Sequence, residues 1–462
     1  MDANVKGTWS AVHDWPLIPI HVVLLPNGHL LSYGTTAAGQ QSAFFIYDVW
    51  NPPEGASNGH TTLPNGTGTD TFCGSQLVLP SSGDVVLAGG DVWNGTQTLN
   101  VGNNNSVIFS LANQLLARGD NMNQQRWYST MTTLVDGEMY IQGGRDSNAI
   151  GSTRPEIRGT DGTFRLLQNV DTSKWDWYYP RNWVAPDGRL FGYDSYGQMW
   201  FIDPTGDGTA TSAGTLPAPN QGLDASAAMF APGKILQWGG ESNGAIVIDI
   251  SSGAPVVAAT QSMLQQRRYG TATLLADGEV LATGGSSVRN TLTNVSYNAE
   301  IWNPATGTWT IGADEAVARL YHSSAILLPD ASVLVGGGGA NGPLTNLNVE
   351  TYYPPYLFAA NGTLAPRPTV AGMPGTVAIG QTFTLTYGNA NAISKVALVK
   401  TGSMTHNWNM DQRYVPLAFS ANGTSLVVKM PTNAPDAPPG YYMLFLISDT
   451  GVPSTGQFVV LK

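Results

Sequence analysis

The sequence predicts an all-β protein in which seven repeated blades close into a propeller and a β-sandwich follows. Charged residues make up 11% of the 462 residues, against about 25% in typical soluble domains. The chain also contains 54 glycines and 29 prolines. This composition is typical of a turn-rich β protein, and the 42% of hydrophobic residues is sufficient to form a large core. The other two observations are a recurrent turn motif and a C-terminal segment that lacks helical periodicity.

The turn motif recurs seven times along the first three quarters of the chain. Each unit has an apolar segment, a tight turn, a second apolar strand and, in most units, a glycine pair. Asp-Gly between two apolar runs indicates a hairpin, because the turn needs a positive φ. The seven turns are centred on Gly28, Gly83, Gly137, Gly188, Gly233, Gly278 and Ala331. Their spacing of 45 to 55 residues, with Gly-Gly at strand ends, is the signature of kelch repeats and predicts a seven-bladed propeller.

The two ends of the predicted propeller meet in its last blade. The sixth repeat carries Gly307-Thr308-Trp309, the seventh lacks an equivalent, and the missing motif stands at Gly7-Thr8-Trp9. We therefore expect the N-terminal strand to complete the last blade, which removes an open sheet edge. The propeller domain is expected to span residues 1–358. After a proline-containing linker, residues 366–462 alternate as in an immunoglobulin-like β-sandwich.

Charge and cysteine content restrict the classes of partner. A net charge of −11 argues against nucleic acid as a ligand. No apolar run of about 18 residues is present, so no transmembrane helix is expected, and the first residues do not form a signal peptide. The single cysteine, Cys73, excludes an internal disulfide framework. We expect a monomer that acts on a small molecule.

Equivalent positions of the seven innermost strands should form a ring around the propeller axis. Counting back nine or ten residues from each turn reaches Pro19, Cys73, Tyr128, Tyr179, Asp224, Tyr269 and the pair Tyr321-His322. Two phenols, an imidazole and a thiol that converge on one end of a channel have the composition of a metal site. The alternative interpretation is that the tyrosines only fill the channel and that the cysteine is a small buried hydrophobe.

Four further side chains have two interpretations each. His406 lies in a polar stretch of the C-terminal segment and is a ligand only if that stretch reaches into the channel; otherwise it is an exposed histidine. His21 and His60 are candidates to support such a site from behind or are ordinary core residues. Arg181 either holds a substrate oxygen or pairs with main-chain carbonyls.

Four segments resemble those of the copper radical oxidases, the family of galactose oxidase and glyoxal oxidase. The segment that ends at Cys73 resembles the one that carries a cross-linked cysteine. Arg126-Trp127-Tyr128 has the glyoxal oxidase form of the radical tyrosine motif, since galactose oxidases have glycine before that tyrosine. The segment 319–323 resembles the axial tyrosine and the first histidine, and Thr405-His406 resembles the second histidine. The resemblance covers essentially the whole chain and is closer to the glyoxal oxidase branch.

The resemblance implies a copper ion beside a tyrosyl radical whose tyrosine, Tyr128, is joined to Cys73 by a thioether. It implies Tyr128, His322 and His406 as equatorial ligands and Tyr321 as the axial ligand and general base. The radical takes a hydrogen atom from a small primary alcohol or aldehyde, and O2 reoxidises the site and leaves as hydrogen peroxide. It also implies a location outside the cell or in the cell envelope.

The sequence also departs from the galactose oxidase pattern. The N-terminal sugar-binding domain is absent from this chain, and Arg145-Asp146-Ser147 follows the glycine pair where galactose oxidases place a stacking tryptophan. We expect Trp175 or Trp177 to substitute, and Tyr179 and Tyr269 to line the pocket. Small alcohols or aldehydes are therefore expected in preference to galactose. The alternatives are a sugar alcohol oxidase and a non-catalytic kelch binding propeller; motifs of a hydrolase or lyase are missing.

Overall fold

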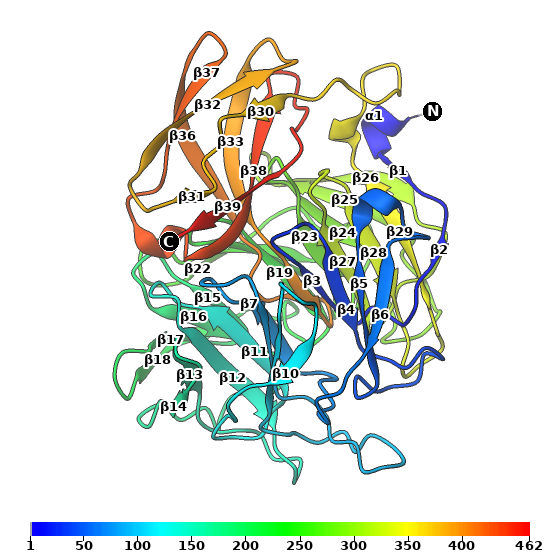
Figure 1. The fold of residues 1–462 in the computed structure, drawn as a ribbon, viewed down its shortest axis with the longest axis vertical. Coiled ribbons are helices and arrows are strands. Elements are labelled where there is room, and N and C mark those ends of the chain that lie inside the picture. Colours follow the sequence, from blue (N-terminus) through cyan, green and yellow to red (C-terminus); the bar gives the residue numbers. More distant parts are fainter. Residues whose placement is uncertain (1) are drawn as a thin grey trace.

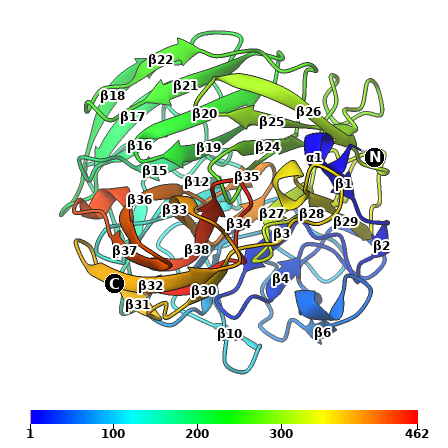
Figure 2. The same cartoon turned by 90° about the horizontal axis from the view of Figure 1, so that it is seen from above.

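The computed structural model describes residues 2–462; Met1, the first residue of the expected propeller, lies outside this range. Seven antiparallel sheets surround one axis, and a second β unit lies over one face of the ring (Figure 1). Viewed from above, the sheets follow one another around the ring (Figure 2). The expected seven-bladed propeller with a C-terminal β-sandwich is confirmed. Within residues 2–462 we find no helix that is both long and apolar enough to cross a membrane.

Each blade is a meander of four strands, and the first strand lies next to the axis. The blades are β3 (His21–Leu24), β4 (Leu30–Tyr33), β5 (Ile46–Trp50) and β6 (His60–Pro64); β7 (Ser75–Val78), β8 (Val85–Ala88), β9 (Ser106–Phe109) and β10 (Leu116–Arg118); β11 (Trp127–Thr133), β12 (Met139–Arg145), β13 (Glu156–Arg158) and β14 (Phe164–Leu166); β15 (Arg181–Val184), β16 (Leu190–Tyr193), β17 (Gln198–Asp203) and β18 (Thr209–Thr215); β19 (Ala225–Ala231), β20 (Lys234–Gly239), β21 (Ala245–Asp249) and β22 (Val256–Ala259); β23 (Thr271–Leu274), β24 (Val280–Thr283), β25 (Asn298–Asn303) and β26 (Thr308–Asp314); and β27 (Ser323–Leu327), β28 (Val333–Gly337) and β29 (Asn348–Tyr353). Three short 3-10 helices, η1 (Pro52–Glu54), η2 (Pro355–Leu357) and η3 (Ala434–Asp436), lie in the connections.

The burial of the strands follows their order in the blade. All residues of β7, β11 and β23 are buried, whereas β10 and β18 at the outer edge are largely exposed. The inner strands are therefore buried on both faces, because they pack against neighbouring blades and line the axis. The hairpin turns use positive φ where the sequence places glycine, with φ of 85° at Gly137 and 93° at Gly278.

The N-terminal segment supplies the outer strand of the seventh blade. After the short helix α1 (Ala3–Lys6), β1 (Thr8–Trp9) and β2 (His13–Asp14) both pair with β29. Thr8 lies opposite Tyr353 and Trp9 opposite Tyr352. The Trp9 ring also packs on Tyr352, with ring centroids 4.9 Å apart. The ring of blades is thus closed by non-covalent pairing of residues more than 300 positions apart in the sequence.

The C-terminal unit contains β30 (Thr369–Ala371), β31 (Thr376–Val377), β32 (Thr382–Gly388), β33 (Ile393–Lys400), β34 (Ser403–Thr405), β35 (Trp408–Asn409), β36 (Tyr414–Asn422), β37 (Ser425–Lys429), β38 (Gly440–Ser448) and β39 (Gln457–Leu461). In β32, buried and exposed residues alternate, as in a strand with one face to a core and one to solvent. The buried side chains of β33 and β38 are divided between the sandwich core and a cluster shared with the propeller. The two units therefore share apolar core.

One hairpin of this unit leaves the sandwich and enters the propeller. Strand β34 pairs with β3, so that β35 and β34 extend the sheet of the first blade at the axis. Both strands lie near the middle of the ring in Figure 2. Gln76 of β7 donates to the carbonyl of Met404, and the Ser403 hydroxyl donates to the carbonyl of Gln76. The channel is thereby filled by main chain from another unit.

We expect Trp9→Ala to loosen the closure of the ring. Loss of its half-buried ring should lower the free energy of unfolding by about 2 kcal/mol and raise hydrogen exchange at the amides of β29. Trp309→Ala is the matched control, since Trp309 occupies the equivalent place in a blade whose strands are continuous in sequence. Equal exchange at β29 in both variants would contradict a closing role for β1.

Candidate metal centre

The residues that open the inner strands share an uncommon backbone conformation. Cys73, Tyr128, Tyr179, Tyr269 and His322 have φ between 36° and 74°, in the left-handed region that non-glycine residues seldom occupy. Such residues concentrate at functional sites, where the surrounding structure holds them. Main-chain hydrogen bonds connect three of them across blades: Tyr128 N–H donates to Cys73 O at 2.8 Å, and Tyr179 N–H to Tyr128 O at 2.9 Å.

A tight turn at the tip of the inserted hairpin presents the second histidine. His406 and Asn407, which join β34 to β35, have φ of 48° and 58°. Two successive positive φ values match the type I′ turn of a two-residue hairpin. Asn407 Nδ2 donates to Ala225 O at 2.9 Å, and Ser226 Oγ donates to Asn407 O at 2.9 Å. The fifth blade thus fixes the turn, and the His406 side chain is 1% exposed.

At the axis, donor atoms from four separate parts of the chain come together. Potential ligand atoms of Cys73, His322 and His406 all lie within 4.8 Å of one another. Cys73 Sγ is 3.0 Å from His406 Nε2, and the hydroxyls of Tyr128 and Tyr321 are hydrogen-bonded to each other. The two imidazole rings are nearly perpendicular, with centroids 4.5 Å apart. The structure therefore brings together all five residues that the sequence suggested for one centre.

Burial keeps both imidazoles in their neutral form. His322 Nδ1 lies 2.6 Å from Gly339 O, so Nδ1 carries the proton and Nε2 carries the lone pair. This Nε2 is buried and has no hydrogen-bond partner among residues 2–462. Burial lowers the pKa of His322 to about 3 and that of His406 well below its usual value. A buried lone pair left without a donor is costly unless something occupies the site.

The thiol and the phenols keep their protons when no cation is present. Burial raises the pKa of Cys73 well above its usual value, and the neighbouring Tyr128 phenol partly opposes this. Burial also raises the pKa values of Tyr128 and Tyr321, and the negative forms of neighbouring groups raise them further. Ionisation of these groups therefore requires a nearby positive charge, which a bound metal ion supplies.

His21 lies directly behind the cysteine. Its Nε2 accepts the Cys73 N–H at 3.0 Å, and its Nδ1 pairs with Gln76 Oε1 at 3.0 Å. Burial lowers the pKa of His21 to about 3, so the ring stays neutral and fixes the main chain of Cys73. His60 lies elsewhere: it pairs with Asp48 at 2.7 Å and packs against Trp15, outside the centre.

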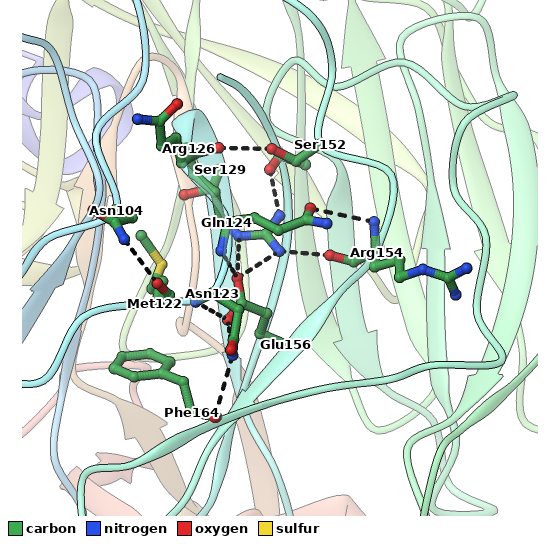
Figure 3. A network of polar contacts seen from close by, with 12 residues as sticks. Asn104, Met122, Asn123, Gln124, Arg126, Ser129, Ser152, Arg154, Glu156 and Phe164 are labelled. Carbon is green, nitrogen blue, oxygen red and sulfur yellow. Dashed lines mark hydrogen bonds and ion pairs between the residues drawn. The ribbon is translucent and has the colours of Figure 1, made fainter. Parts of the chain in front are cut away.

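A buried ion pair fixes the strand that carries Tyr128 (Figure 3). Arg126 NH1 donates to Gly143 O at 2.8 Å, and its Nε and NH2 donate to Glu156 Oε1 at 3.3 and 3.0 Å. Glu156 also accepts the main-chain N–H groups of Asn123 and Gln124. Buried pairs are stable only when their remaining polar atoms are satisfied in this way. The same arrangement recurs as Arg267–Glu300 and Arg319–Glu350.

The aromatic neighbour of Tyr128 differs from the expected one. Tyr178 stacks on Tyr128, with centroids 4.7 Å apart and planes 24° apart. The expectation for Trp175 was wrong, since Trp175 stacks on Trp200 in another cluster. Trp177 lies 6.0 Å from Tyr128, but its plane is inclined by 64°. Tyr178 carried no signal in the repeat count, because it precedes the ring position of its blade by one residue.

The three proposed substrate-pocket residues have different surroundings. Tyr269 packs beside Tyr321, with ring centroids 4.7 Å apart. The Tyr179 ring lies 5.0 Å from Tyr128, and its hydroxyl donates to Gly74 O. Arg181 is 5% exposed and donates to the carbonyls of Tyr179 and Ala225. Its polar contacts thus follow the main-chain alternative considered above.

Comparison with known proteins agrees with this architecture. The model of the galactose oxidase-like early set domain matches residues 367–461, and that of the kelch motif matches residues 267–314. A galactose oxidase of Gibberella zeae is 27% identical and covers 98% of this chain, which spans 70% of that protein. An aldehyde oxidase (GLOX) of Vitis pseudoreticulata is 28% identical over 85% of this chain and 82% of its own length.

A solved structure of a fungal alcohol oxidase in complex with copper superposes with a TM-score of 0.87. It is 24% identical and covers 99% of both chains, and at this identity the likeness shows the fold. Together, the fold, the domain models and relatives that cover 85 to 98% of this chain support the copper radical oxidase family, which includes galactose oxidases and aldehyde oxidases.

Proposed function

We propose that this protein is a copper radical oxidase that oxidises small primary alcohols or aldehydes with O2 and produces hydrogen peroxide. One observation carries the proposal: a buried lone pair on His322 faces a second neutral imidazole, a thiol and two phenols at the end of the channel. The relatives that span most of the chain are named galactose oxidase and aldehyde oxidase, which supports the same class of reaction.

The donor set fits copper. Copper(II) binds well to imidazole nitrogen and anionic oxygen ligands, and one coordination position can stay open for a substrate. In our proposal His322, His406, Tyr128 and Tyr321 would hold the ion. The neutral imidazoles bind a metal ion without losing a proton, whereas each phenol must lose its proton to bind. Hydrogen bonds of the His322 ring to the Gly339 carbonyl and of the His406 ring with the Thr405 hydroxyl orient the two rings.

We further propose a thioether between Cys73 Sγ and the ring of Tyr128. The main-chain hydrogen bond between these residues supports it, since it keeps the two side chains in adjacent blades at one height. Forming the bond removes the thiol hydrogen and one ring hydrogen, and the two electrons pass to O2, which becomes hydrogen peroxide. A rival arrangement, supported by the short distance from Cys73 Sγ to His406, has the cysteine as a direct metal ligand.

When bound, copper supplies a Lewis acid for the substrate oxygen and a one-electron acceptor beside the tyrosine. The chain supplies the rest of the chemistry. Tyr321 accepts the hydroxyl proton of the alcohol or of the aldehyde hydrate, and the linked Tyr128 accepts a hydrogen atom from the same carbon. Tyr178, stacked on Tyr128, covers one face of the ring and excludes water from it. Tyr179 and Tyr269 form an aromatic wall that suits small substrates with an apolar face.

A sugar oxidase is the second candidate. The galactose oxidase of Gibberella zeae, which covers 98% of this chain, favours it. A pocket for a sugar needs several convergent polar groups, however, and Arg181 is engaged with main-chain carbonyls. We therefore prefer small primary alcohols or aldehydes over sugars as the proposed substrates.

The first prediction concerns the thioether. A sample treated with copper and O2 should lose the mass of two hydrogens, and Cys73 should resist alkylation under denaturing conditions. The controls are Cys73→Ser and Tyr128→Phe, whose masses should not change on the same treatment. Full alkylation of Cys73 in the treated wild-type protein would refute the cross-link.

His406→Ala should weaken copper binding by at least about a hundredfold, because one of two nitrogen ligands is removed. Equilibrium competition with a chelator measures the change. His29→Ala is the control, since His29 lies in a turn away from the channel. Wild-type copper affinity in His406→Ala would show that the inserted hairpin supplies no ligand.

Steady-state turnover should distinguish the two substrate classes. We expect kcat/KM to be higher for glyoxal-type aldehydes, benzyl-type alcohols or glycerol than for galactose, because the aromatic wall offers few hydrogen-bond partners to a sugar. Peroxide production measures the rates. The highest kcat/KM for galactose would reverse the choice between the candidates.

A further inference from the structure

A cluster of charged side chains lies between the fifth and sixth blades, beside the proposed pocket. Asp224, which is 0% exposed, organises it. Its main-chain carbonyl accepts the N–H of Tyr269 at 3.0 Å. One oxygen of its carboxylate, Oδ2, accepts Arg268 NH1 at 2.9 Å and Arg289 Nε at 3.1 Å. A single residue thus fixes the position of both the pocket tyrosine and two guanidinium groups.

The cluster carries an excess of positive charge. Two arginines share the one buried carboxylate of Asp224, and Glu241 is the only other acid among residues 2–462 that pairs with them. The Glu241 side chain is 60% exposed and lies 3.4 Å from Arg268 NH2, so solvent weakens that pair. Among residues 2–462, Arg289 makes polar contacts through Nε alone, and its side chain is 46% exposed. The two terminal nitrogens of Arg289 are therefore available to a ligand.

This excess charge lies one aromatic ring away from the proposed reaction centre. The Tyr269 ring packs against Tyr321, with centroids 4.7 Å apart. Burial raises the pKa of Tyr269 to about 12, and the positive charge of Arg289 acts against this increase. Asp224 and Arg268 precede β19 and β23, which contact each other in neighbouring blades, and Arg289 lies in the connection between β24 and β25. In a chain with a net charge of −11, local cations are needed if an anion is to bind here.

We propose that Arg289, held with Arg268 by Asp224, binds the carboxylate of the substrate, so that the preferred substrates are small aldehydes that carry a carboxylate. Planar guanidinium groups match carboxylates through parallel N–H···O bonds. A carboxylate bound by Arg289 would place a short aldehyde along Tyr269 toward Tyr321. This inference rests on the proposed oxidase function and specifies the substrate of the same site.

The test compares two small aldehydes of similar size, glyoxylate as the anion and methylglyoxal as the neutral compound, with the copper-loaded protein. Arg289→Gln should lower kcat/KM for glyoxylate about tenfold and change that for methylglyoxal less than about twofold. Arg289→Lys should restore part of the loss. Increased salt should lower kcat/KM for glyoxylate in the wild-type protein, with a much weaker effect in Arg289→Gln.

Arg165→Gln is the matched control, because the Arg165 side chain is 44% exposed and pairs with Glu138 on the outer part of the third blade. It should leave both substrates unaffected. A second readout needs no turnover: saturation-transfer NMR on the methyl signal of acetate should detect binding to the copper-free wild-type protein and not to Arg289→Gln.

Equal effects of Arg289→Gln on both aldehydes, or unchanged acetate binding, would overturn the proposed subsite. The absence of peroxide from both aldehydes, with acetate binding still dependent on Arg289, would instead overturn the oxidase proposal and leave an anion-binding site.

Discussion

The centre depends on the way in which each blade meets the axis. An inner strand begins with a residue in the left-handed conformation, and main-chain hydrogen bonds join these residues from blade to blade, as from Tyr128 to Cys73 and from Tyr179 to Tyr128. A propeller blade is rigid because its inner strand is buried on both faces. Side chains from distant parts of the sequence are therefore held at one height without a flexible loop, which is the preorganisation that a reactive metal centre needs.

The second constraint is the hairpin from the C-terminal unit. Its pairing with β3 fills the channel with satisfied main chain and carries His406 to the end of the axis. Neither unit can assemble the centre alone, because His322 belongs to the propeller and His406 to the hairpin. The shared apolar cluster between the units then has a functional consequence, since it fixes the distance between the two imidazoles.

Much of this arrangement could be predicted from the sequence because the repeat imposes it. The turn spacing fixed the number of blades, and the offset from each turn located Cys73, Tyr128, Tyr269 and His322. The stacking partner of Tyr128 could not be predicted in this way. Tyr178 lies one residue before the counted position, in an irregular segment whose path depends on tertiary packing. Trp175 looked equivalent in composition but found a better partner in Trp200.

The contacts of the charged side chains could not be predicted from the sequence either. The sequence suggested a substrate role for Arg181, yet its guanidinium donates to the carbonyls of Tyr179 and Ala225. No motif in the sequence singled out Arg289, which lies in a long connection between β24 and β25. Its position depends on the contact with Asp224, 65 residues earlier. Pairings of this kind depend on which blades are neighbours and on how their loops fold.

The central claim is that the two imidazoles and Tyr128 bind one copper ion while the sulfur of Cys73 bonds to the tyrosine ring. Anomalous diffraction at the copper edge from crystals of the copper-loaded protein tests this most directly. We predict one peak within bonding distance of His322 Nε2, His406 Nε2 and the Tyr128 oxygen, with continuous density between Cys73 Sγ and the Tyr128 ring. A peak bonded to Cys73 Sγ, or one away from the axis, would contradict the account.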